Sequence, residues 1–143
     1  MRPSGTPVGL QLALTSKLVS RAFNDVLAEA GGTLPVWLVL SSLKQEHRRT
    51  QLELARAIGI EGPTLTRHLD GLEESGLVVR HRDTDDRRAV RVELTEAGER
   101  LYAALLKDVI AFNKRLTAGL SEQELARLNR GLAQLADNVR DES

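Results

Sequence analysis

The sequence contains no cysteine, few aromatic residues (3%) and no excess of charge of either sign. The lack of cysteine excludes a disulfide framework, thiolate catalysis, a zinc ribbon and a cysteine redox switch. No apolar run approaches the roughly 20 residues that cross a bilayer, and no export signal is found at the N-terminus. We therefore expect a cytoplasmic protein with no membrane partner. Because 20 basic residues balance 20 acidic ones, we expect any attraction to nucleic acid to come from a local basic patch.

The 143 residues suffice for one domain, and their composition, 41% hydrophobic and 28% charged, is typical of a folded protein. Residues 1–9 are rich in proline and glycine, and we expect them to form a flexible arm. Helical spacing of apolar residues predicts N-terminal helices over 10–46, the second capped by Thr33, and C-terminal helices over 95–143. Residues 47–94 between them follow a different pattern and are interpreted as a separate domain.

Two short helices are predicted between residues 50 and 76. Residues 50–53 (TQLE) fit a capping box that begins a helix ending at Gly59. Pro63 suits the first position of the next helix, which Gly76 ends. Two short helices joined by about four residues that include glycine indicate a helix-turn-helix.

A β-hairpin is predicted after the second of these helices. Residues 77–82 are rich in strand-forming side chains, and residues 90–94 alternate apolar and polar. The polar loop between them makes the hairpin a wing. The predicted fold is therefore mainly α with a small β-wing, a winged helix-turn-helix with dimerisation helices from both termini.

The terminal helices carry more apolar surface than the small central domain can cover. In the last helix, apolar residues are spaced 3, 4, 3, 4, as in a short coiled-coil seam; they are Leu125, Leu128, Leu132, Leu135 and Val139. We expect them to pack against a second copy of the chain in a two-fold dimer. The alternative is that the terminal helices pack on one another within a monomer.

The outer face of the second short helix carries the first candidate contact with DNA. If Leu65, Leu69 and Leu72 point inward, a turn of about 100° per residue directs Arg67 outward. An arginine at the N-terminal half of such a helix can contact guanine in the major groove. The alternative is a solvated arginine paired along the helix with Asp70 or Glu74. The other candidate DNA-binding residues of this helix are Pro63, Thr64, Thr66 and His68.

The wing supplies the second candidate contact. Arg87 and Arg88 lie in its loop, and an arginine there can enter a narrow minor groove. The residues do not decide which of the two enters. We expect the neighbouring Asp86 to hold a guanidinium in one orientation. The alternative is a surface loop with offsetting charges.

These segments resemble the MarR family of bacterial transcription regulators, and the SlyA-like branch in particular. The resemblance is strongest over residues 52–67, the helix-turn-helix, over 69–77, and over 86–95, the wing. It implies a homodimer that binds pseudo-palindromic promoter DNA through Pro63, Thr64 and Arg67 in the major groove and Arg87 in the minor groove. Asp85 stands where the family pattern has arginine, which should weaken binding by the wing.

The resemblance also implies an effector, since proteins similar to the SlyA-like branch bind small aromatic carboxylates such as salicylate. Trp37 could line such a pocket between the dimerisation helices and the DNA-binding domain; the alternative is that Trp37 belongs to the core. We expect the ligand to release the protein from DNA. We interpret the protein as a repressor, and activation is the alternative that the sequence leaves open.

The sequence predicts no catalytic site. It contains no nucleophile elbow, phosphate-binding loop or dinucleotide fingerprint, and its histidines lack metal-ligand spacing. We therefore expect no enzyme activity, no metal and no cofactor. The remaining alternative is a winged helix that binds a protein partner without touching DNA.

Overall fold

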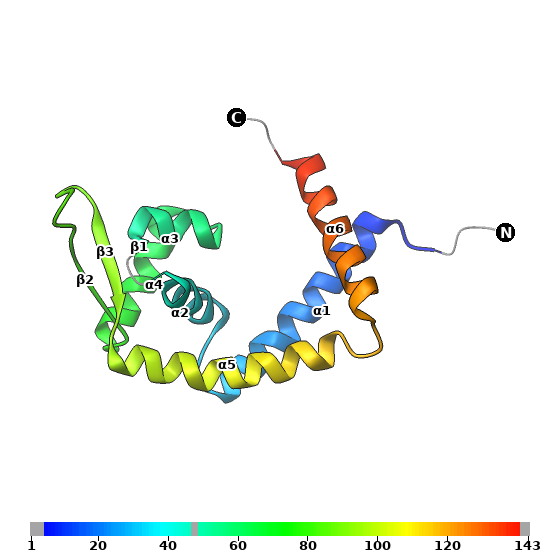
Figure 1. Ribbon diagram of the computed structural model, residues 1–143, viewed down its shortest axis with the longest axis horizontal. Helices are drawn as coiled ribbons and strands as arrows, with labels where there is room; N and C mark the ends of the chain where they lie inside the picture. The colour runs from blue at the N-terminus through cyan, green and yellow to red at the C-terminus, as the bar shows by residue number, and fades with distance from the viewer. Residues whose placement is uncertain (1–4, 47–48, 141–143) are drawn as a thin grey trace. The chain divides into compact units, whose positions relative to one another are not determined.

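The computed structural model describes residues 5–46 and 49–140. Helices predominate, and the strands form one small sheet (Figure 1). The elements in chain order are α1 (Val8–Glu29), α2 (Leu34–Gln45), β1 (Arg49–Thr50), α3 (Gln51–Ile58), α4 (Gly62–Glu74), β2 (Val78–Arg82), β3 (Val90–Leu94), α5 (Glu96–Leu116) and α6 (Glu122–Val139).

Three helices begin at side-chain caps, and the first two of these caps are predicted from the sequence. Thr33 accepts a hydrogen bond from the backbone nitrogen of Val36 at the start of α2, and Thr50 accepts one from Glu53 at the start of α3. Ser121 and Glu124 form both bonds of a capping box at α6. Each bond satisfies a backbone group that would otherwise lack a partner in the helix.

The range predicted for the arm, residues 1–9, overlaps the start of α1. Residues 1–4 lie outside the described part of the chain, and α1 begins at Val8. Pro7 occupies the position just before the helix, where a missing N–H group breaks no intrahelical hydrogen bond. Proline and glycine therefore marked the start of the helix rather than the extent of an arm.

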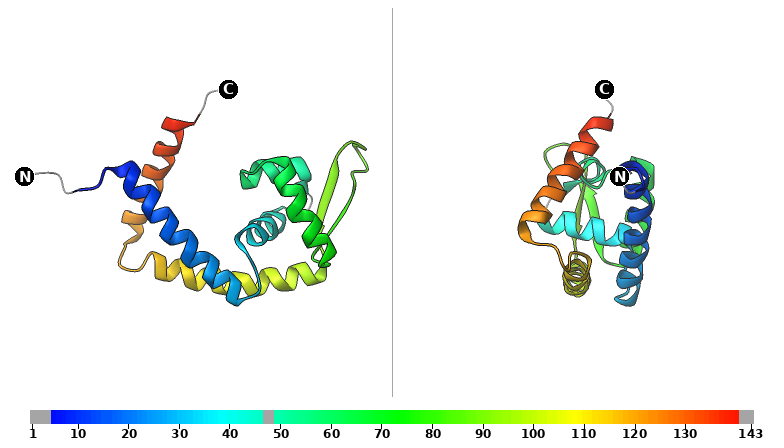
Figure 2. Two further views of the ribbon diagram at one scale, coloured as in Figure 1. Left: turned by 180° about the vertical axis from the view of Figure 1, so that it is seen from behind. Right: turned by 90° about the vertical axis from the view of Figure 1, so that its right-hand side faces the viewer.

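The wing is a three-stranded antiparallel sheet with the order β1-β3-β2. β2 and β3 form the predicted hairpin, in which Val78 pairs with Leu94 and Arg82 with Val90. The short strand β1 was not predicted, because two residues are too few to show a period. Figure 2 shows the hairpin from behind, with the loop between β2 and β3 at its free end.

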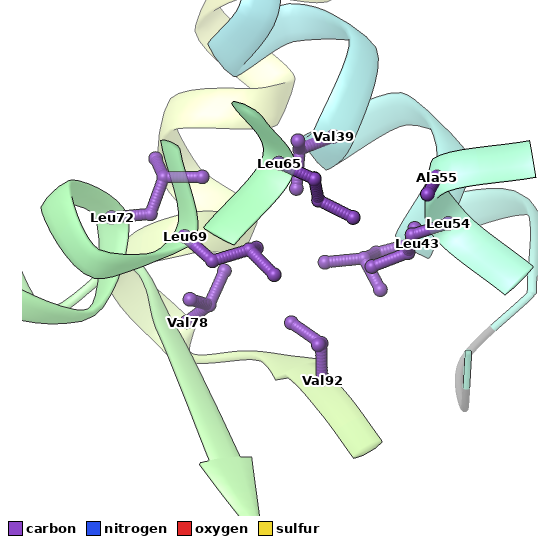
Figure 3. Packing of buried hydrophobic residues seen from close by; sticks show 9 residues of the cluster. All are labelled: Val39, Leu43, Leu54, Ala55, Leu65, Leu69, Leu72, Val78 and Val92. Atoms are coloured by element: carbon purple, nitrogen blue, oxygen red, sulfur yellow. The ribbon is translucent and has the colours of Figure 1, made fainter. Parts of the chain in front are cut away.

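A hydrophobic core fixes α4 within the winged helix. Figure 3 shows the side chains of Leu65 and Leu69 pointing toward Val92 of β3. Burying each leucine contributes about 1.5–3 kcal/mol. The rotation of α4 about its axis is therefore set by its inward face. The buried members of this core are Val39, Leu43, Leu54, Ala55, Leu65, Leu69, Leu72, Val78 and Val92.

A second cluster joins α1, α2 and α5. Its buried members are Leu27, Leu40, Leu105 and Val109. Trp37 is half-buried beside them, and its ring stacks on that of Tyr102 with 5.5 Å between centroids and an interplanar angle of 4°. Residues 5–110 form one compact unit, and residues 111–140, the end of α5 with α6, form another.

Both α1 and α6 carry exposed apolar side chains. The exposed apolar residues of α1 are Val8, Leu10, Leu12, Leu14 and Leu18, and those of α6 are Leu128, Leu132, Leu135 and Val139.

No single helix in the described ranges is long and apolar enough to span a membrane. The helices α1 and α2 pass that test only together, with a bend of 78° between them.

Candidate nucleic-acid interface

Arg67 lies on the exposed face of α4, opposite the buried leucines, as the helical spacing predicted. Among the residues that the structure describes, no ion pair to its guanidinium is found, so its five N–H groups face solvent or a ligand. The alternative pairing with Asp70 is not formed, because Asp70 binds Arg80 instead.

The other predicted contacts of α4 differ in how much of each side chain is available. Pro63 is exposed in the first turn of the helix, whereas Thr64, Thr66 and His68 are half-buried. These four residues and Arg67 are brought together within about two turns of one helix. A DNA duplex could therefore contact them at one place.

Thr66 has a structural role that the sequence did not reveal. Its hydroxyl group donates to the carbonyl oxygen of Gly62 (3.0 Å) and accepts from Nε2 of Gln51 (2.7 Å). Because Gln51 begins α3, this bond ties the two helices of the helix-turn-helix together. The hydroxyl oxygen is thus engaged within the protein, which leaves the methyl group of Thr66 for a contact with a base.

The wing loop carries two exposed arginines, Arg87 and Arg88, as predicted. Arg82 holds the loop from β2, since its Nη1 atom donates to the carbonyl oxygen of Arg87 (2.9 Å). Asp86 has a different partner from the one expected. Its Oδ1 atom accepts from the backbone nitrogen of Arg88 (3.0 Å), so the bond found holds the turn and not a guanidinium.

A different carboxylate, Asp83, binds an arginine guanidinium at the base of the wing loop. Its Oδ1 atom accepts from Nε of Arg91 (2.7 Å), and its side chain is buried. The hydrogen bond from Arg91 lowers the pKa of Asp83, because it favours the charged form. The sequence placed both residues in or beside the wing but contained no signal that they pair.

Arg80 does not add to the positive surface of the wing. Its Nη2 atom binds Asp70 (2.6 Å) and Glu73 (3.0 Å), both on α4. The hydrogen bond from Arg80 lowers the pKa of Glu73 and is the largest cause of the raised pKa of Arg80. The C-terminal half of α4 is therefore joined to β2 by an ion-pair cluster.

A hollow of about 360 Å³ adjoins α4. Arg67 and His68 contribute to its wall, so this wall includes two predicted DNA contacts. Trp37 lies in the neighbouring core against Tyr102, and its role in a ligand pocket stays a prediction. The residues lining the hollow are Gly31, Val36, Arg67, His68, Gly71, Leu72, Ser75, Leu77 and Leu101.

Metal binding has no support in the described ranges, 5–46 and 49–140, which contain no cluster of three or more histidine, aspartate or glutamate side chains placed to hold an ion. What the geometry does provide is a fixed helix with an exposed arginine, next to a hairpin whose loop carries two more. This arrangement suits a polyanion with grooves, since phosphates attract the arginines and base edges can be read between them.

Comparisons with known proteins agree with this geometry. Residues 33–90 match the model of the MarR family. The transcriptional repressor CouR, bound to a 23-mer DNA duplex, is 32% identical with a TM-score of 0.84, and the match covers 91% of this chain and 92% of that one. A mutant of MarR from E. coli, complexed with operator DNA, is 28% identical with a TM-score of 0.83, covering 90% and 93%.

A third match shows the likeness of fold alone. BpsR of Bordetella bronchiseptica, whose DNA binding is regulated by 6-hydroxynicotinic acid, is 21% identical with a TM-score of 0.85, covering 95% of this chain and 99% of that one. The mainly α fold with a small three-stranded sheet is thus confirmed, as is the winged helix. Members of the matched family are transcription regulators and not enzymes. The chain belongs to the MarR family and is a transcriptional regulator.

Proposed function

We propose that the protein is a homodimeric repressor, of the SlyA-like branch, that binds pseudo-palindromic promoter DNA in the cytoplasm and is released by a small aromatic ligand. The observation that carries the proposal is the position of Arg67. It lies on the exposed face of the second helix of a helix-turn-helix whose opposite face is buried. In a helix-turn-helix that binds DNA, this second helix lies in the major groove.

The wing supplies the second anchor on DNA. Arg87 and Arg88 are exposed in a loop held by the bonds of Arg82 and Asp86. A loop that is already ordered loses less conformational entropy on binding. One of these arginines enters the minor groove, where phosphates on both sides attract it, and the other contacts the backbone.

The dimer accounts for the apolar residues that α1 and α6 expose. Leu128, Leu132 and Leu135 lie on one side of α6, three and four residues apart, and all three are exposed. Burying such a stripe against a second copy removes apolar surface from water. Two recognition helices about 34 Å apart would then meet successive major grooves.

The proposed effector binds in the hollow beside α4. Val36, Leu72 and Leu101 give it an apolar wall for an aromatic ring, and Arg67 and His68 lie at the same hollow. A carboxylate held by Arg67 would compete with DNA for the same guanidinium. BpsR offers a precedent within the same fold for control by such an acid, 6-hydroxynicotinic acid.

A gel-shift titration tests the assignment of the interface. The DNA is a duplex that the wild-type protein selects from a randomised pool, and the variant combines Arg67→Ala with Arg87→Ala. We expect the affinity to fall by about 100-fold or more, because a bidentate base contact of Arg67 and the wing contact of Arg87 are lost. Arg140→Ala, which removes an exposed arginine at the end of α6, is the control. Equal binding by the variant and the wild type would refute the assignment.

The same titration, repeated at increasing salt concentrations, separates this proposal from a winged helix that binds only proteins. Binding to DNA releases counterions and weakens steeply as salt rises, whereas a mainly apolar contact does not. Titrating salicylate and 6-hydroxynicotinate into the preformed complex tests the effector. Release by either acid, but not by an aliphatic acid of equal charge, supports the proposed pocket.

A further inference from the structure

The recognition helix carries acidic residues where a DNA-binding surface should be positive. Asp70, Glu73 and Glu74 all lie on α4, after Arg67. Asp70 follows Arg67 by three residues, a rise of about 4.5 Å along the helix. That separation is within the Debye length of about 10 Å at 0.1 M salt. A bare carboxylate there would repel the phosphates on either side of the groove that Arg67 enters.

The structure shows how two of these three charges are offset. A single side chain, Arg80 of β2, binds both Asp70 (2.6 Å) and Glu73 (3.0 Å) through Nη2. The backbone nitrogen of Arg80 also donates to Oε2 of Glu73 (3.2 Å). Arg80 is therefore linked to α4 by three bonds from one residue.

Exposure separates the roles of the three partners. The side chain of Arg80 is 18% exposed, whereas those of Asp70 and Glu73 are 59% and 42% exposed. Arg80 is thus too enclosed to serve as a freely moving phosphate contact. The carboxylates are exposed on α4. Without Arg80 they would present uncompensated negative charge to the DNA backbone.

We propose that Arg80 is a positioning residue for DNA binding, which halves the net negative charge of Asp70 and Glu73 so that the C-terminal half of the recognition helix can lie beside phosphates. This inference rests on the proposed function. Arg80 thereby acts through α4 and not through a contact of its own with DNA.

The test compares three variants on the duplex selected by the wild-type protein. Arg80→Met exposes both carboxylates without a partner, and we expect the affinity to fall about tenfold at 0.1 M salt. Arg80→Met combined with Asp70→Asn and Glu73→Gln contains no charge in the cluster, and we expect it to recover to within about threefold of wild type. Asp70→Asn with Glu73→Gln alone keeps two amide oxygens for Arg80, and we expect it to bind at least as tightly as wild type.

The control is Arg140→Met, which removes an arginine that also pairs with a carboxylate, Asp137, outside the winged helix. Cooperative thermal unfolding is measured for each variant. A second readout is salt: the difference between Arg80→Met and wild type should narrow as salt rises, because repulsion is screened, whereas a purely structural defect would persist.

The outcomes distinguish this inference from the proposed function. If the wild type selects no duplex, the proposed function fails. If the wild type binds but the triple variant, while folded, stays as weak as Arg80→Met, charge compensation by Arg80 is refuted. If Arg80→Met does not fold, the double variant decides, since a tenfold loss of affinity there would mean that the carboxylates themselves are needed for binding.

Discussion

Asp83 and Arg91 close the base of the wing loop through a hydrogen bond of 2.7 Å between Oδ1 and Nε. Asp83 directly follows β2, and Arg91 lies in β3, so the pair joins the two strands where the loop begins. The backbone nitrogen of Asp83 also donates to the carbonyl oxygen of Ala89 (3.0 Å). The loop that carries Arg87 and Arg88 is therefore held at its base by side chain and backbone together.

Two substitutions in this loop should have opposite effects on DNA binding. Asp83→Ala removes the bond to Arg91, and we expect an affinity about threefold to tenfold lower because the wing must be ordered on binding. Asp85→Ala removes an exposed carboxylate near the proposed minor-groove contact, and we expect tighter binding. Fluorescence anisotropy with the selected duplex measures both. Each substitution removes one negative charge. If both change the affinity for DNA equally, an ordering role for Asp83 is contradicted.

Acid should destabilise the fold through two carboxylates that pair with arginines, those of Glu73 and Asp83. Hydrogen bonds from Arg80 and Arg91 hold the pKa of Glu73 and of Asp83 below their ordinary values of 4.5 and 3.8. Between the lowered and the ordinary pKa the unfolded chain binds more protons, so stability falls as pH decreases. This contribution is complete at neutral pH. The free energy of unfolding, measured with urea over about pH 2–6, should fall less steeply with decreasing pH for Glu73→Gln combined with Asp83→Asn than for wild type. An identical dependence on pH in both proteins would contradict the pairings.

The start of α5 should tolerate no side chain at Gly98. A Cβ atom there would overlap the carbonyl oxygen of Leu77, which also accepts a hydrogen bond from the backbone nitrogen of Thr95. We expect Gly98→Ala to destabilise the protein by about 1–3 kcal/mol or more. Gly131→Ala is the matched control in α6, where a Cβ meets nothing within 4 Å; there alanine should stabilise the helix by up to about 1 kcal/mol. Urea unfolding of both variants measures the difference, and equal stability would argue against the close approach.

The apolar residues of α6 should control the oligomeric state. Leu132→Asp places a charge in the apolar stripe that the proposed dimer buries. We expect the dissociation constant of the dimer to rise by about 100-fold. Leu52→Asp, on an exposed leucine of α3, should leave the dimer intact. Sedimentation equilibrium measures both dissociation constants. A wild type that remains monomeric at all concentrations would exclude the dimer.

The local signals in the sequence were sufficient for nearly all of the fold. Thr33 and Thr50 cap helices as predicted, and Gly59 adopts φ 80° where α3 ends. These features depend on residues a few positions apart, so a single sequence contains them. The strand β1 and the pairing of Arg49 with Val92 depend on residues 43 positions apart, and no local period reveals them.

The candidate interface was predicted in outline but not in its bonds. The position of Arg67 follows from helical geometry, because the buried leucines fix the face on which it lies. The partners of Arg80 and Asp83 could not be read in advance, since several carboxylates and arginines in the same segment offered equivalent pairs. Thr66 was interpreted as a DNA contact, yet Gln51, fifteen residues earlier, engages its hydroxyl group.

The most direct test of the account is the dependence of binding on the distance between the two half-sites. The wild-type affinity is measured for the selected duplex and for the same duplex with about five base pairs inserted at its centre, which turns one half-site to the opposite side of the helix. The account predicts two protein chains per duplex and a loss of affinity of at least about 100-fold on insertion, because a dimer cannot then place both Arg67 side chains in major grooves. Unchanged affinity, or one chain bound per duplex, would contradict it.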